Sequence, residues 1–144
     1  MKVLNAAALA VALGWAAAAH AGEAKKATIY KPTQCGCCDE YATYLKKHGF
    51  TVDVISMPNP GLIKKMKGVP QGFEGCHTMM VDGYVVEGLV PINTLNKLLT
   101  EKPKINGISL PGMPVGSPGM PGRKTAPLII YELSGNPPKE YARE

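Results

Sequence analysis

The pattern of apolar and polar positions predicts an alternation of strands and helices through the middle of the chain. Residues 27–31 form a short strand-like run, and residues 50–55 alternate in polarity and are rich in β-branched side chains. Between them, the apolar residues of segment 37–48 recur at spacings of three and four, which predicts a helix that ends at Gly49. Because two strands joined by a helix are normally parallel, these elements predict a β-α-β unit with a right-handed crossover.

The next segment predicts a short basic helix, a hairpin and a final helix. Asp82-Gly83 is a strong hairpin signal, since both residues tolerate the backbone angles of a tight turn. Pro91 suits the first turn of a helix. The apolar positions of that last helix are Leu95, Leu98 and Leu99. The predicted elements span residues 62–67, 77–81, 84–87 and the helix from residue 91. The order β-α-β-α-β-β-α predicts an α/β fold of the thioredoxin or glutaredoxin type.

Composition changes after residue 106. The stretch 108–122 is rich in proline and glycine and contains Met113 and Met120 in identical Pro-Gly-Met-Pro repeats, so no regular element is predicted there. Residues 126–133 are apolar and predict a late strand, and the proline near its start favours an edge position. The polar residues 134–144 are expected to be loose.

The N-terminal segment has the features of a secretory signal. One charge at Lys2 precedes an alanine-rich apolar run, and Ala19-His20-Ala21 is a small-x-small cleavage pattern. The alternative, an uncleaved membrane anchor, is disfavoured because the run is short for a membrane span, and no later segment is apolar for long enough. We therefore expect a periplasmic protein cleaved between residues 21 and 22. The expected parts are a signal (1–21), a thioredoxin-like metal-binding domain (22–106) and a Pro/Gly/Met-rich extension (107–144).

The charge of the chain excludes one class of partner. The formal net charge is +5, but the lysines are scattered and no aromatic residues alternate with them. Nucleic-acid binding would require a denser basic patch. The lysines are expected to lie on solvated helix faces, and neither nucleic acid nor, after signal cleavage, a membrane is an expected partner.

The motif Cys35-Gly36-Cys37-Cys38 carries the most specific chemistry. It lies between an expected strand and the start of a helix, where unpaired backbone N–H groups and the helix dipole favour thiolates. A thiolate is both the nucleophile of disulfide exchange and a ligand for soft metals. Cys35 and Cys38 have the spacing of a redox dithiol, whereas the third sulfur would interfere with disulfide exchange and is useful to a metal cluster.

A second cysteine motif, Cys76-His77, precedes the third expected strand. In a thioredoxin-like fold this position lies beside the first cysteine motif, where the family usually carries a cis-proline. A fourth sulfur and an imidazole are therefore expected to face the first three sulfurs. A histidine on a strand is often a packing residue, but next to a cysteine we interpret His77 as a ligand or as a group that supports one.

This ligand set favours copper(I), with zinc as the alternative. Thiolates suit both metals, but zinc prefers two separated cysteine pairs around one ion, whereas a Cys-x-Cys-Cys motif suits sulfurs that bridge several copper(I) ions. Iron–sulfur spacings do not match. Met113 and Met120 are less certain additional ligands, because thioethers also favour copper(I). The other methionines are expected to be packing residues.

Two further functions stay open at this stage. A thiol-disulfide oxidoreductase would use Cys35 and Cys38 and tolerate loss of Cys37. A small structural module would close two disulfides, and four cysteines allow three pairings. The pattern favours a metal-binding protein over an enzyme, and any catalysis would be copper or thiol-disulfide redox chemistry. No Ser-His-Asp triad, phosphate loop or paired-carboxylate site is present, so no catalytic residue is assigned.

Three segments in order resemble a known family. They are YKPTQCGCCDEYATYLKKHGF, GCHTMMVDGYVVEGLVP and LPGMPVGSPGM. The chain between residues 28 and 120 resembles the CopG-type copper-resistance proteins, a periplasmic metal-binding family formerly catalogued as a domain of unknown function. The resemblance implies a thioredoxin-like fold, copper as the bound metal, and other periplasmic copper-handling proteins as partners. It implies copper binding at Cys35, Cys37, Cys38 and Cys76, with His77 in the family's Cys-His step. A redox role, the interconversion of copper(I) and copper(II), has been suggested for that family.

Overall fold

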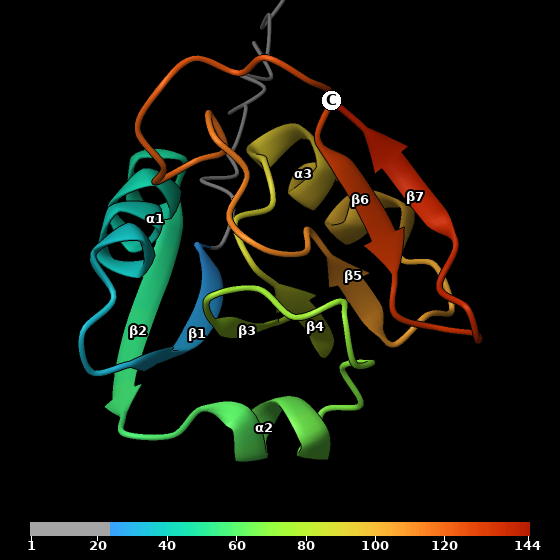
Figure 1. Ribbon diagram of the computed structural model, residues 1–144, viewed down its shortest axis with the longest axis horizontal. Helices are drawn as coiled ribbons and strands as arrows, with labels where there is room; N and C mark the ends of the chain where they lie inside the picture. Colours follow the sequence, from blue (N-terminus) through green and yellow to red (C-terminus); the bar gives the residue numbers. More distant parts are fainter. Residues whose placement is uncertain (1–23) are drawn as a thin grey trace, which may run out of the picture.

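One mixed β-sheet of seven strands organises residues 24–144, which are the residues that the computed structural model describes (Figure 1). The strands lie in the order β2-β1-β3-β4-β5-β6-β7. The predicted signal segment 1–21 and its cleavage site lie outside the described residues. Among residues 24–144, no helix is long and apolar enough to cross a membrane.

The element order predicted for residues 25–101 is confirmed. It consists of β1 (Lys25–Pro32), α1 (Gly36–Lys47), β2 (Phe50–Met57), α2 (Gly61–Met66), β3 (Thr78–Val81), β4 (Tyr84–Glu87) and α3 (Ile92–Glu101). Strands β1 and β2 are parallel, as expected for a β-α-β unit, and β3 is antiparallel to both β1 and β4. The α/β class predicted from the sequence is therefore confirmed.

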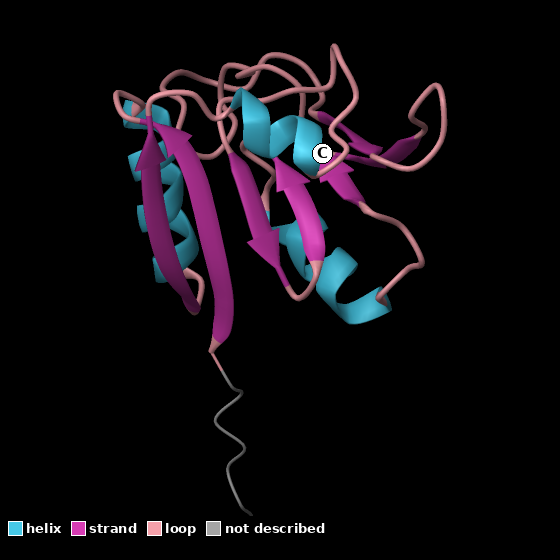
Figure 2. Ribbon diagram, turned by 90° about the horizontal axis from the view of Figure 1, so that it is seen from below, coloured by secondary structure: helices cyan, strands magenta, loops and turns pink. Residues whose placement is uncertain are grey.

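The main core lies between the sheet and the helices α1 and α3. Figure 2 shows these two helices behind the sheet and the short α2 in front of it. Tyr41 and Leu45 of α1 are fully buried, and so is Met79 of β3. The apolar positions predicted for α3 are also buried, since Leu95 and Leu98 are inaccessible and Leu99 is nearly so. Burial of these side chains positions the N-terminal end of α1, where the cysteine motif lies.

The C-terminal extension continues the same sheet. It contributes β5 (Gly107–Ser109), β6 (Ile129–Glu132) and β7 (Glu140–Arg143). Strand β5 is parallel to β4, and β6 is antiparallel to both β5 and β7.

Two expectations for the extension were wrong. The late strand is not at the edge, because β6 is flanked on both sides. Its proline, Pro127, precedes the strand and so removes no ladder hydrogen bond. The polar tail is not loose, since it forms the edge strand β7, in which Tyr141 packs against the core. A single half-buried aromatic residue among polar ones was too weak a signal to indicate this strand.

The last residue of the chain caps α3. Pro91, the residue before the helix, has no capping side chain, and the Glu144 carboxylate instead accepts hydrogen bonds from the backbone N–H of Thr94 (2.9 Å) and from its hydroxyl. Glu144→Ala should lower the free energy of unfolding by about 1 kcal/mol, because a first-turn N–H loses its acceptor and the helix dipole loses a negative charge.

Urea unfolding measures this loss, and Glu140→Ala is the matched control. Glu140 forms an exposed ion pair with Arg143, so its removal should cost less than about 0.5 kcal/mol. Equal losses in the two variants would show that Glu144 contributes no more than a surface charge.

Candidate metal centre

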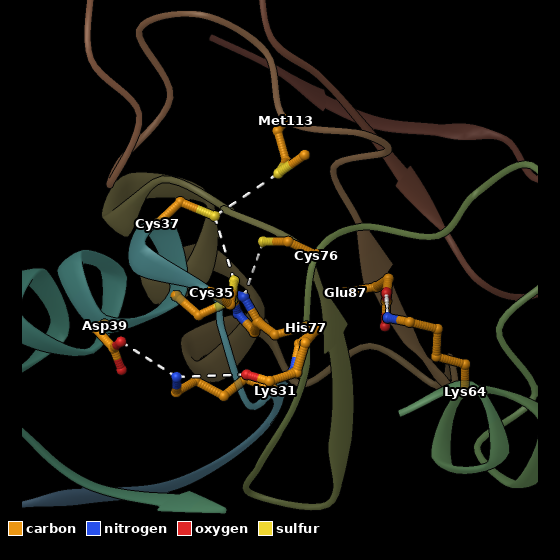
Figure 3. The surroundings of a disulfide bond; sticks show 11 residues. Lys31, Cys35, Cys37, Asp39, Lys64, Cys76, His77, Glu87 and Met113 are labelled. Carbon is orange, nitrogen blue, oxygen red and sulfur yellow. Dashed lines mark hydrogen bonds and ion pairs between the residues drawn. A yellow bond between two sulfur atoms is a disulfide. The ribbon is translucent and has the colours of Figure 1, made fainter. Parts of the chain in front are cut away.

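Four cysteine sulfurs converge at one end of the sheet. The sulfur atoms of Cys35, Cys37, Cys38 and Cys76, here called the sulfur cluster, all lie within 4.8 Å of one another (Figure 3). The topology explains this convergence. Strand β1 runs into the first cysteine motif, and the antiparallel β3 begins beside the end of β1 just after Cys76. The two motifs therefore meet as predicted, while their role as metal ligands stays a prediction.

Two of the four cysteines are joined in the structure. Cys35 and Cys38 form a disulfide with a Cα–Cα distance of 5.4 Å, whereas Cys37 and Cys76 are free thiols. The Cys37 sulfur lies 3.5 Å from that of Cys35. Cys38 is fully buried and the other three are half-buried. The arrangement is the oxidised dithiol pair with two additional thiols beside it.

His77 lies against the sulfur cluster without joining it. Its Nδ1 is 3.3 Å from the Cys76 sulfur, and its ring packs on Tyr41 with the centroids 5.0 Å apart. Burial, with the charge of Lys64, lowers the pKa of His77 to about 3, so the ring is neutral at physiological pH. Its Nε2 is buried without a hydrogen-bond partner. The structure thus places His77 as a neutral neighbour of Cys76, through Nδ1.

Burial also affects the thiol of Cys76. Desolvation, and to a lesser extent the neighbouring Cys37, raise the pKa of Cys76 to about 12. The metal-free protein therefore carries this thiol protonated. A metal that binds here must displace the proton, as thiolate ligation requires.

The structure distinguishes Met113 from Met120, which the sequence alone could not do because their local sequences are identical. The Met113 sulfur lies 3.7 Å from the Cys37 sulfur, and the residue is 51% exposed. Met120 packs instead against the main core. Between them, Gly119 has a φ of +90°, and a Cβ there would lie 2.6 Å from the Cys37 carbonyl oxygen. This close approach seats the loop on the start of α1, with Met113 as the methionine that reaches the sulfur cluster.

The sequence analysis missed an acidic network behind Cys76. Glu87, fully buried at the end of β4, forms an ion pair with Lys64 of α2. Its carboxylate also accepts hydrogen bonds from the backbone N–H of Gly75 (2.8 Å) and the Thr78 hydroxyl (2.7 Å). The available signal was a carboxylate at the end of a strand whose other positions are apolar.

The donor set fits a soft metal ion. Four thiolates around one zinc ion would lie about 3.8 Å apart, so the spacing in the sulfur cluster does not by itself exclude zinc. Met113 adds a thioether, which is a ligand for copper(I) and is not among the usual zinc ligands. This combination of sulfur donors is typical of a site for a soft metal ion.

Comparison with known proteins gives one family and two structures. Residues 73–120 match the family described as "Protein of unknown function, DUF411". A structure named "Copper resistance protein copG- Form 2" is 32% identical, with a TM-score of 0.78, and the match covers 85% of this chain and 99% of that one. A second structure, "Copper resistance protein copG- Form 1", is 33% identical, with a TM-score of 0.76, and the match covers 85% of this chain and 98% of that one. No curated protein matches the chain.

Proposed function

This chain belongs to the family of the copper resistance protein CopG, and from that premise we propose that it binds copper(I) through its sulfur cluster. The observation that carries the proposal is the convergence of four cysteine sulfurs within 4.8 Å. We propose that Cys35, Cys37, Cys38 and Cys76 are the ligands. The protein would act in copper resistance or homeostasis.

The neighbours of the sulfur cluster have graded roles in this proposal. His77 supports Cys76 through Nδ1, and Met113 is an additional ligand on the exposed side. Met120 contributes through packing of the loop, not through its sulfur.

The cellular setting is part of the proposal. The features of residues 1–21 support export and cleavage before Gly22, which would place the thioredoxin-like domain 22–106 and its extension 107–144 in the periplasm. Copper ions are the proposed ligand, and other periplasmic copper-handling proteins would deliver or accept them.

A redox step between copper(II) and copper(I) is compatible with the disulfide. The reduced thiols of Cys35 and Cys38 would give up two electrons and two protons on forming their disulfide, and the electrons would reduce two copper(II) ions to copper(I). The free thiols of Cys37 and Cys76 would remain as ligands. In a separate step, two thiols of a reductant would reduce the Cys35–Cys38 disulfide and themselves be oxidised to a disulfide, which would restore all four ligands.

Copper content tests the proposal. The protein without residues 1–21, reduced and loaded anaerobically with copper(I), should retain two or more copper ions per chain after desalting, by elemental analysis. Cys37→Ser should retain fewer, because it removes the sulfur that lies next to both Cys35 and Met113. Loading with zinc in parallel tests the alternative metal. No retained copper, or an unchanged count in Cys37→Ser, would contradict a thiolate copper cluster.

The Cys35–Cys38 disulfide supports a second candidate, a thiol-disulfide oxidoreductase. An oxidoreductase would catalyse reduction of a disulfide substrate, would lose this activity in Cys35→Ser, and would keep it in Cys37→Ser. A copper-binding protein would instead lose copper in Cys37→Ser. Cys37 distinguishes the two functions because a dithiol catalyst does not need a third sulfur.

A further inference from the structure

An ion pair buried behind Cys76 has no part in the function proposed so far. Glu87 is 0% exposed and the Lys64 side chain 13% exposed, so both charges are withdrawn from water. Burying two charges costs as much as or more than their attraction returns, and an apolar pair of similar volume often stabilises a protein equally well. The position of the pair therefore calls for an explanation other than stability.

The Glu87 carboxylate holds the chain on both sides of the Cys76-His77 step. One oxygen accepts from the backbone N–H of Gly75, the residue before Cys76, and the other from the hydroxyl of Thr78, the residue after His77. The next residue, Gly88, donates its N–H to the His77 carbonyl at 3.0 Å. Glu87 and Gly88, at the end of β4, thus make three hydrogen bonds to residues 75–78. This segment contains Cys76, a proposed ligand.

The backbone is closely packed around this segment. A Cβ on Gly75 would lie 2.4 Å from the Gly88 Cα. Gly75 also forms a β-bridge with Gly112, and the Gly112 N–H donates to the Glu74 carbonyl at 2.9 Å. Gly112 precedes Met113, so the same contacts that place Cys76 also place the thioether beside Cys37.

Lys64 connects this arrangement to α2. No residue of this helix is fully buried, and the Lys64 side chain reaches the sheet at Glu87 and at the Thr78 hydroxyl (3.4 Å). Figure 3 shows Lys64 and Glu87 on the side of Cys76 away from Cys35 and Cys37. A carboxylate accepts several hydrogen bonds at once, which lets Glu87 hold Gly75 and Thr78 while it pairs with Lys64.

We propose that Lys64 and Glu87 are positioning residues for the metal centre, which hold Cys76 and, through the Gly75–Gly112 bridge, Met113 against the other cysteines. This inference rests on the proposed copper binding for its purpose, but the positioning itself is independent of copper.

The first test measures positioning without copper. In a Cys35→Ser/Cys38→Ser background, only Cys37 and Cys76 can form a disulfide, and equilibrium with glutathione gives their effective concentration. Adding Lys64→Met should lower that concentration about tenfold, because the Cys76 segment loses its restraint. Glu87→Gln, which keeps the side-chain volume, is the second variant in case Lys64→Met fails to fold, and should lower it in the same direction. Unchanged values in both variants would overturn the proposal.

The second test measures copper. In the reduced four-cysteine protein, competition with a chromophoric copper(I) chelator should show a 10- to 100-fold weaker affinity in Lys64→Met, the usual range for residues that orient ligands. Glu144→Ala, which weakens the fold away from the sulfurs, is the matched control and should keep the wild-type affinity. Equal losses in both variants would mean that general destabilisation is the cause. If the wild type binds no copper, the proposed function fails, while the glutathione measurement still decides the positioning.

Discussion

Closing the Cys35–Cys38 disulfide should remove at least half of the copper that the reduced protein retains. The disulfide takes two of the four sulfurs out of thiolate form and leaves Cys37 and Cys76, with Met113 beside them. Copper(I) is ligated by thiolates, not by disulfide sulfur. The expected result is a fall in copper stoichiometry on oxidation and its return on reduction.

Elemental analysis after desalting, with thiol titration of the same samples, measures this effect. The oxidised protein should show two free thiols per chain and the reduced protein four, because the other two cysteines stay free in the structure. Cys35→Ser/Cys38→Ser is the control, since it cannot form the disulfide and its copper content should not respond to mild oxidation. Full copper retention in wild-type protein with two free thiols would contradict ligation by Cys35 and Cys38.

Gly107→Ala should be the most destabilising of the substitutions considered for this fold, with a loss of about 3 kcal/mol or more in the free energy of unfolding. A Cβ at Gly107 would lie 1.8 Å from the Val85 carbonyl oxygen, so β5 would have to move away from β4. The Gly107 carbonyl also accepts from the Leu133 N–H at 2.8 Å, which links β5 to the segment after β6. The loss therefore spreads across the strands of the extension.

Thermal and urea unfolding test this prediction, with Gly36→Ala as the matched control. A Cβ at Gly36 meets nothing within 4 Å, and the residue begins α1, so alanine should be neutral or slightly stabilising there. The melting temperature of Gly107→Ala should fall by roughly 10 °C. A change of less than about 1 kcal/mol would show that β4 and β5 separate at little cost.

The parts of the fold that the sequence predicted are those with a local signal. Apolar spacing indicated α1, and the Asp82-Gly83 turn indicated the β3–β4 hairpin. The convergence of the cysteines followed from topology, because a loop after one strand and a loop before its antiparallel neighbour share one end of the sheet. None of these inferences depends on how side chains pack.

The features that were missed depend on contacts between distant residues. Strand β5 is three residues long and starts with a glycine, so nothing in its composition distinguishes it from the surrounding Pro-Gly segment. Met113 and Met120 have the same local sequence, and only the course of the loop brings one of them to Cys37. The Lys64–Glu87 pair joins residues 23 positions apart, on a helix and a strand whose relative placement the sequence does not indicate.

The sulfur cluster has one sealed side and one exposed side, and under the proposed function this asymmetry bears on how copper would be transferred. Cys38 and His77 are inaccessible to solvent, whereas the contact between Cys37 and Met113 lies at the surface. In the proposed copper-binding protein, an incoming thiol of an acceptor protein would meet the exposed Met113 side, where it would displace the weak thioether before a thiolate. Transfer by such associative steps would never release a hydrated copper ion. The rate of copper transfer should therefore rise with the concentration of the acceptor and should not reach a plateau set by dissociation.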